Sequence, residues 1–113
     1  ILGAVNAIAT SNTVSNSRLD ELSSAIAVNN IKPAQCTMNL ASIIICTGGT
    51  CNGTSANNLI LGTSAGETIN ENGGRDCILG GDGNDTIQGN GGKDVCYGGP
   101  GTDTINCETI YDP

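Results

Sequence analysis

The second half of the chain is a tandem repeat of nonapeptides. Residues 53–106 divide without insertion into GTSANNLIL, GTSAGETIN, ENGGRDCIL, GGDGNDTIQ, GNGGKDVCY and GGPGTDTIN. The sixth position is an acid or asparagine in every copy, and the eighth is apolar in every copy. Two columns that stay in phase over six periods are not expected by chance. They predict a stack of equivalent short units, each contacting its neighbours.

The later copies approach the pattern GGxGxDxUx, where U is a large apolar residue. Residues 80–88 match every fixed position, and residues 98–106 do so with Pro100 at a free position. Residues 71–79 and 89–97 keep the aspartate but replace some glycines. These copies resemble the RTX, or haemolysin-type, calcium-binding repeat. The resemblance covers about half of the chain, and it implies a parallel β-roll that binds calcium.

Each nonapeptide is expected to form a glycine-rich turn followed by a short strand. Glycine allows the turn to take positive φ angles and to bring carbonyl groups close together. In the strand, the eighth side chain points inward while the seventh and ninth point outward. Two nonapeptides then complete one coil. The predicted fold is mainly β: a short parallel β-roll of about three such coils with an N-terminal strand or helix appendage.

Turns on the same edge of this roll lie two repeats apart. The sixth-position side chains should therefore stack in two columns, Asn58 with Asp76 and Asp94, and Glu67 with Asp85 and Asp103. Carboxylates stacked in a partly dehydrated groove repel one another strongly. A hard cation that takes six or more oxygen ligands removes this repulsion, and Ca²⁺ tolerates irregular geometry better than Mg²⁺ does. The sequence thus predicts two to three calcium ions.

The predicted calcium sites pair Asp76 with Asp94 and Asp85 with Asp103, and a third site pairs Glu67 with Asp85. Turn carbonyls are the predicted backbone ligands, from Gly73, Gly81, Gly83, Gly91, Gly99 and Gly101. Asn58 is interpreted as a turn residue or a neutral rung. A single Asp-Gly-Asn-Asp cluster would be a solvated turn, and its repetition in phase is what favours metal binding.

Charge excludes several classes of partner. The formal net charge is −7, and nine of the eleven acidic residues follow residue 66. Such a surface repels nucleic acid and anionic membranes and attracts cations. The chain has no histidine and no HExxH motif, so the commonest general base is absent, and we expect no enzyme activity. No apolar run approaches the roughly 20 residues of a membrane span.

Six cysteines in a chain of this size predict disulfides and a secreted, extracellular or cell-surface protein. The absence of a Cys-x-x-Cys pair argues against zinc. A start at Ile1 without methionine fits a removed export signal. Fifteen connectivities are possible. Cys96 and Cys107 flank the last nonapeptide, one local pair can form among Cys36, Cys46 and Cys51, and Cys77 can reach the N-terminal half.

Three segments are expected along the chain. Residues 1–35 begin with an apolar stretch and include an amphipathic helix at residues 17–28, and they form a packing or assembly element. Residues 36–52 contain a strand around Ile43–Cys46 and a Gly-Gly turn, which together make the first rung. Residues 53–113 form the calcium-binding roll.

The strands of alternate copies present an apolar outer face, formed by Leu59, Leu61, Cys77, Leu79, Val95 and Tyr97. A contiguous apolar surface of this kind is a packing surface. Either residues 1–35 of the same chain cover it, or those of a neighbour do. The second case predicts a homo-oligomer or filament, whose subunits are secreted structural proteins stabilised by calcium and disulfides. The first case predicts a monomeric secreted module that folds in the presence of calcium.

Overall fold

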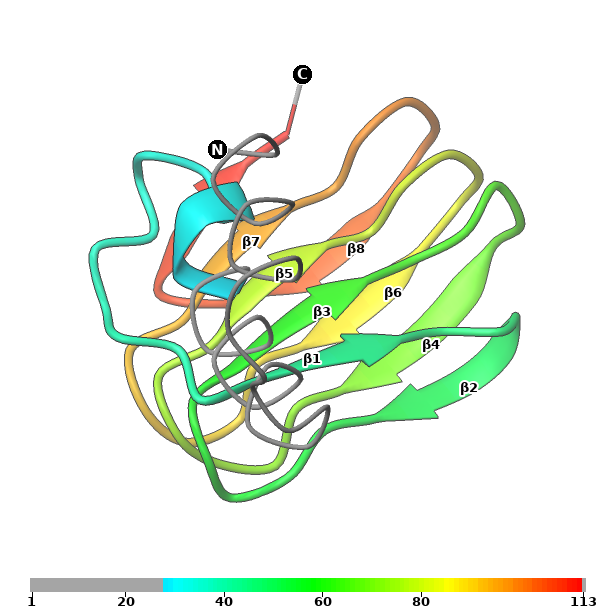
Figure 1. Cartoon of the computed structure of the whole chain (residues 1–113). Helices are drawn as coiled ribbons and strands as arrows, with labels where there is room; N and C mark the ends of the chain where they lie inside the picture. The colour runs from blue at the N-terminus through cyan, green and yellow to red at the C-terminus, as the bar shows by residue number, and fades with distance from the viewer. Residues whose placement is uncertain (1–27, 113) are drawn as a thin grey trace, which may run out of the picture.

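A computed structural model describes residues 28–112, and these residues wind into a parallel β-solenoid of about four turns (Figure 1). Its strands are β1 (Ser42–Ile45), β2 (Gly49–Asn52), β3 (Asn58–Leu61), β4 (Glu67–Asn70), β5 (Cys77–Leu79), β6 (Thr86–Gln88), β7 (Val95–Tyr97), β8 (Thr104–Asn106) and β9 (Thr109–Tyr111). The odd strands form one sheet in the order β1-β3-β5-β7-β9, and the even strands form the other in the order β2-β4-β6-β8. The mainly β, parallel roll predicted from the repeat is confirmed.

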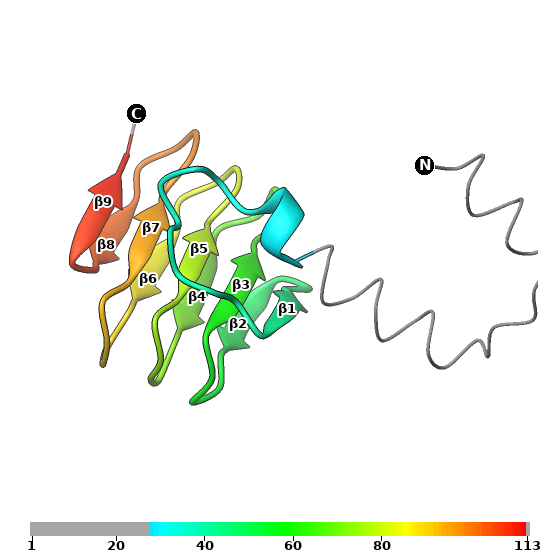
Figure 2. The same cartoon turned by 60° about the vertical axis from the view of Figure 1, so that its left-hand side comes forward.

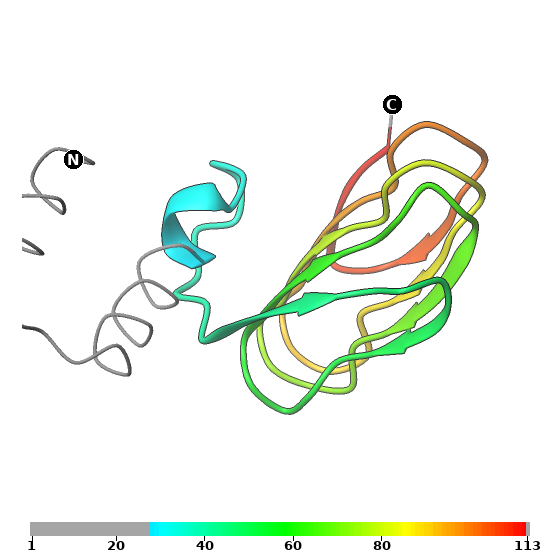
Figure 3. The same ribbon diagram turned by 45° about the vertical axis from the view of Figure 1, so that its right-hand side comes forward.

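The strand register confirms that one coil contains two nonapeptides. Leu59 pairs with Cys77, and Cys77 pairs with Val95, so partners in neighbouring strands lie two nonapeptides apart in the sequence. The even sheet keeps the same spacing, with Thr68 beside Thr86. Figure 2 shows the strands succeeding one another along the roll, and Figure 3 shows the coils stacked nearly end-on.

The ends of the roll depart from the nonapeptide period. Ser42 of β1 pairs with Asn58 of β3, and Val95 of β7 pairs with Thr109 of β9. Both spacings are shorter than two nonapeptides. The predicted strand and Gly-Gly turn correspond to β1 and to Gly48 and Gly49, which both have positive φ. Strands β2 and β9 were not predicted, because neither carries the alternating apolar signal of a strand.

The core between the two sheets is formed by one inward-facing side chain from each of the strands β1 to β8. The eighth-position residues Ile60, Ile69, Ile78, Ile87 and Cys96 are all fully buried, and Ile105 is partly buried. Because each coil is only two strands thick, one aliphatic side chain from each strand fills it. The strand geometry thus explains how a chain without phenylalanine or tryptophan builds a core.

All six cysteines form disulfides: Cys36–Cys77, Cys46–Cys51 and Cys96–Cys107. The Cys96–Cys107 bond and a bond from Cys77 to the N-terminal half agree with the expectation from the sequence, which left open which local pair forms among Cys36, Cys46 and Cys51. The Cys46–Cys51 bond closes the turn between β1 and β2, and the Cys96–Cys107 bond joins β7 to the segment that leads into β9. The Cys36–Cys77 bond fastens the N-terminal part of the described chain to the outer face.

Residues 28–40, the covering segment, lie across the outer face of the odd sheet (Figure 2). Four side chains of this segment are buried: Val28, Cys36, Met38 and Leu40. They pack on Leu59, Cys77 and Val95. Leu61, Leu79 and Tyr97 are partly buried against the same cluster. The chain's own residues therefore cover the outer face, although the alternative left open by the sequence gave this role to residues 1–35, and Cys36, Met38 and Leu40 lie in the segment predicted as the first rung.

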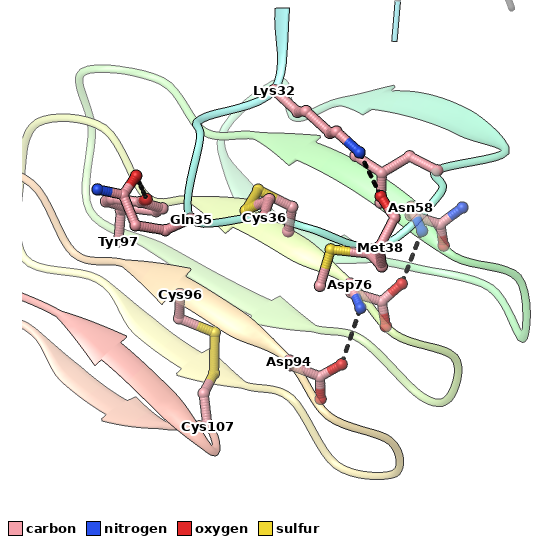
Figure 4. The surroundings of a disulfide bond; sticks show 12 residues. Lys32, Gln35, Cys36, Met38, Asn58, Asp76, Asp94, Cys96, Tyr97 and Cys107 are labelled. Carbon is pink, nitrogen blue, oxygen red and sulfur yellow. Dashed lines mark hydrogen bonds between the residues drawn. A yellow bond between two sulfur atoms is a disulfide. The ribbon is translucent and has the colours of Figure 1, made fainter. Parts of the chain in front are cut away.

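Polar contacts close the covering segment on itself and join its middle to the outer face. The Asn29 side chain donates to the Leu40 carbonyl at 3.2 Å and accepts from the Leu40 amide at 3.0 Å, which closes the segment into a loop. The Tyr97 hydroxyl donates to Oε1 of Gln35 at 2.6 Å, and the Lys32 ammonium donates to the Met38 carbonyl (Figure 4).

The helix predicted at residues 17–28 lies outside the described residues except for Val28, and the apolar stretch that begins the chain lies outside them entirely. Residues 28–31 are helical. Among the described residues there is no helix of the length and apolarity needed to cross a membrane.

Candidate metal centres

Four turns share a conformation that requires residues tolerant of positive φ. They are residues 71–76, 80–85, 89–94 and 98–103, called here the calcium-type turns. Their second and fourth positions all have positive φ: Asn72, Gly74, Gly81, Gly83, Asn90, Gly92, Gly99 and Gly101. Asparagine replaces glycine at Asn72 and Asn90 because it is among the few other residues that adopt this region readily. These two substitutions therefore preserve the turn.

The sixth-position aspartates of the calcium-type turns form hydrogen-bonded ladders along the two edges of the roll. On the first edge, Oδ1 of Asp76 accepts from the Asn58 amide at 2.7 Å, and Oδ1 of Asp94 accepts from the Asp76 amide at 2.9 Å (Figure 4). On the second edge, Asp85 accepts from the Glu67 amide and Asp103 from the Asp85 amide, both at 2.8 Å. The structure thus stacks the aspartates in the two columns expected from the repeat.

The second carboxylate oxygen of each ladder aspartate is buried without a partner. These atoms are Oδ2 of Asp76, Asp85, Asp94 and Asp103. A buried carboxylate oxygen without a hydrogen bond or counter-charge is costly. This cost is visible in the pKa values. The pKa of Asp94 is raised to about 6, mainly by burial and further by the charges of Asp76 and Glu108, although the hydrogen bond from the Asp76 amide lowers it. Burial likewise raises the pKa of Asp76 and of Asp85.

Glycine at the first position of the turn leaves the space into which these oxygens point. A Cβ atom at Gly80 would lie 2.6 Å from Oδ2 of Asp85. A Cβ at Gly89 would lie 2.5 Å from Oδ2 of Asp94, and one at Gly98 would lie 2.4 Å from Oδ2 of Asp103. A side chain at any of these glycines would displace the unpaired carboxylate oxygen, so glycine at this position maintains the geometry of the turn.

Backbone oxygens must supply the remaining ligands of an ion held in these turns. Within residues 28–112, no three acidic or cysteine side chains converge on one point. The hydrogen bonds between the turns of this part of the chain use acceptors other than the six predicted glycine carbonyls, those of Gly73, Gly81, Gly83, Gly91, Gly99 and Gly101. A pair of carboxylates with several carbonyls is a donor set that suits Ca²⁺, which takes six to eight oxygens.

The two earlier turns, residues 53–58 and 62–67, are closed by threonine instead. Oδ1 of Asn58 accepts from both the amide and the hydroxyl of Thr54 at 3.0 Å. Glu67 accepts from the amide of Thr63 at 2.8 Å and from its hydroxyl. None of the residues at the second and fourth positions of these turns has positive φ. Asn58 is thus a neutral rung, and the carboxylate of Glu67, predicted as a ligand of a third site with Asp85, is already hydrogen-bonded within its own turn.

Two acidic residues that were not predicted also lie on the first edge. Oε2 of Glu108 accepts from the Asp94 amide at 3.0 Å and so extends the ladder beyond the last aspartate. Glu108 follows Asp94 by less than two nonapeptides, so the repeat gave no signal for it. Glu71 is fully buried beside Asp76, at a first position where the repeat pattern has glycine. Burial raises the pKa of Glu71 to about 10, and the carboxyls of Asp76 and Asp94 add to the shift.

Comparison with known families decides what this arrangement is. Residues 72–105 match the model of the RTX calcium-binding nonapeptide repeat in four copies. This part of the chain is similar to an RTX repeat segment. The matched span covers the calcium-type turns except for Glu71, and it excludes both threonine-closed turns, in agreement with the backbone conformations. RTX nonapeptide repeats bind calcium. No curated protein and no solved structure matches the chain.

Proposed function

We propose that this chain is a secreted module whose RTX roll binds Ca²⁺ at both edges and depends on it for stability. The observation that carries the proposal is the row of buried, unpaired aspartate oxygens, one in each calcium-type turn. One ion is held between the turns of Asp76 and Asp94, and one between those of Asp85 and Asp103. Glycine carbonyls of the same turns complete the oxygen shell.

Calcium acts in this proposal by removing an electrostatic penalty. Without a cation, each ladder aspartate either carries an uncompensated buried charge or takes up a proton. A bound Ca²⁺ neutralises two carboxylates at once and links turns of successive coils. Because an ion that binds only the folded roll adds its binding free energy to folding, calcium and folding are coupled.

The three disulfides support an oxidising, extracytoplasmic location. Two of them, Cys46–Cys51 and Cys96–Cys107, lie at opposite ends of the roll, where a coil has a neighbour on one side only. A secreted module of this size benefits from such cross-links because its hydrophobic core is small.

The covered outer face favours a self-contained module over a filament subunit. The filament hypothesis required Leu59, Leu61, Leu79, Val95 and Tyr97 to be open to a neighbouring chain. The covering segment packs on this face, and Leu59 is fully buried. The proposed function is therefore that of a monomeric calcium-dependent module. It includes no catalysis, since the chain lacks histidine and the buried carboxylates belong to the turns.

Calorimetric titration of the oxidised, calcium-free protein tests the proposal. We expect at least two Ca²⁺ ions per chain and a rise of the melting temperature on calcium addition. Replacing calcium with excess EGTA should reverse the rise. No binding, together with the same melting curve in calcium and in EGTA, would show that the roll does not function as a calcium module.

A further inference from the structure

We propose that Glu71 and Asp76 form an additional cation site, specific for a hard divalent ion such as Ca²⁺, that the repeat pattern does not provide. The proposal rests on the proposed calcium-binding function and extends it to a third ion. The site lies on the first edge, between the threonine-closed turn 53–58 and the calcium-type turn 71–76.

The carboxylate of Glu71 is enclosed by the turn of the preceding coil. The residue is 0% exposed. A Cβ atom at Gly53 would lie 2.1 Å from Oε1 of Glu71 and 2.3 Å from its Oε2. A side chain at residue 53 would therefore displace this carboxylate. Gly80, Gly89 and Gly98 contact the aspartate of their own turn in this way, whereas Gly53 contacts Glu71 of the next coil.

Both oxygens of Glu71 lack a hydrogen-bond partner, as does Oδ2 of Asp76. The two carboxyl groups are close enough to interact directly. When both groups are ionised, three acceptor oxygens without a donor thus share a buried space. Without a cation, a proton held by Glu71 can bridge the two carboxyl groups. A divalent cation between Glu71 and Asp76 would satisfy all three atoms and balance two negative charges, with backbone oxygens and water completing a calcium shell.

The other calcium-type turns lack this arrangement. Their first residues are Gly80, Gly89 and Gly98, and a Cβ atom at Gly80 or Gly89 would meet no carboxylate but that of the turn's own aspartate. At Gly98, Oδ1 of Asp112 lies near the same position as Oδ2 of Asp103, but Asp112 comes from the C-terminal end of the chain and not from the first position of a turn. In the threonine-closed turn 53–58, the amide and hydroxyl of Thr54 both donate to Oδ1 of Asn58, so Asn58 adds no free acceptor. Glu71 supplies the carboxylate that Asn58 lacks, and it does so from the next coil. This relation assigns a ligand role to a residue that breaks the repeat pattern.

Glu71→Gln tests the site, because it removes the charge and keeps the shape. Asp82→Asn is the matched control, since it removes one charge from an exposed side chain of a neighbouring turn. In calorimetric titration with Ca²⁺ of the full, oxidised chain, we expect three ions for the wild type and for Asp82→Asn. Glu71→Gln should bind two, or should bind one of the three at least ten-fold more weakly. Glu71→Gly, which restores the glycine of the repeat, should behave in the same way.

The outcomes separate this inference from the proposed function. If Glu71→Gln and Glu71→Gly bind as many ions as Asp82→Asn with the same affinities, Glu71 is a protonated carboxyl only and the additional site is wrong, although the roll still binds calcium. If the wild type binds no calcium, the proposed function itself fails. Diffraction from wild-type crystals grown in calcium decides the question without variants: an ion between Glu71 and Asp76 is expected, and an ion-free gap with both RTX edges occupied overturns the inference.

Discussion

Asp85→Asn should change the stability of the roll in opposite directions with and without calcium. The amide keeps an oxygen that can accept from the Glu67 amide, the bond that Oδ1 of Asp85 makes at 2.8 Å. It removes the charge on Oδ2, the buried atom that has no partner. The substitution therefore separates the structural role of the side chain from its role as a metal ligand.

The expected loss in calcium follows from binding linkage. An ion present at 100 times its Kd stabilises the folded state by about 2.7 kcal/mol, whereas an ion present near its Kd contributes only about 0.4 kcal/mol. A hundred-fold loss of affinity thus costs about 2.3 kcal/mol. For a domain of this size, that corresponds to a fall in melting temperature of roughly 9–18 °C.

In EGTA the sign should reverse. Burial, together with the charges of Asp103 and Glu67, raises the pKa of Asp85, so its ionised form destabilises the calcium-free roll near neutral pH. The neutral amide relieves this cost, and the variant should melt at or above the wild-type temperature. Circular-dichroism melts of the wild type, Asp85→Asn and the control Asp82→Asn, with disulfides intact, measure both effects. An equal loss in calcium and in EGTA would refute the reasoning, because it would make Asp85 a purely structural residue.

Three further predictions concern other parts of the roll. Replacing Cys36 and Cys77 with alanine should lower the free energy of unfolding by about 4 kcal/mol, because the bond closes a loop with a sequence separation of 41. In denaturant unfolding, the midpoint of this variant should be lower than that of the variant that lacks Cys46 and Cys51. Thr63→Val should cost about 1–3 kcal/mol equally in calcium and in EGTA, since it removes the hydroxyl hydrogen bond to buried Glu67 and leaves only that from the Thr63 amide; a loss that depends on calcium would contradict this. Without calcium, the free energy of unfolding should fall as pH rises from about 4 to 6. The reason is that the pKa of Asp94 is raised from 3.8 to about 6 in the folded state, which therefore binds protons more tightly than the unfolded state does. Melting temperatures that rise over this range would contradict the prediction.

The nonapeptide period predicted the central coils well because each strand there obeys the same local rule. Ile60 and Ile78 face inward, and Asp76 and Asp94 stack, as the spacing requires. The pattern also placed Cys77 outward, which made its bond to the N-terminal half foreseeable. Periodicity is a strong predictor here because parallel coils repeat identical backbone contacts.

Prediction was weaker wherever side chains rather than spacing decide the structure. Thr54 and Thr63 close their turns through hydroxyl hydrogen bonds, so these two copies look degenerate yet form regular coils. The role of Glu71 depends on the space left by Gly53, which lies two nonapeptides earlier and becomes its neighbour only when the coils stack. The sequence could not decide whether the same chain or a neighbouring chain covers the outer face. That depends on tertiary contacts such as those of Met38.

The threonine-closed turns make the roll chemically asymmetric along its axis. The coil formed by β3 and β4 has hydrogen-bonded turns that need no ion, and the Cys46–Cys51 bond holds the coil before it. In a stacked solenoid, adding a coil to an existing one avoids the cost of starting a new stack. The N-terminal coils can thus serve as a preformed template whose open edge is already in register. If the roll binds calcium as proposed, we expect calcium to drive elongation rather than nucleation, and hydrogen exchange in limiting calcium to show protection spreading from β3 toward β8.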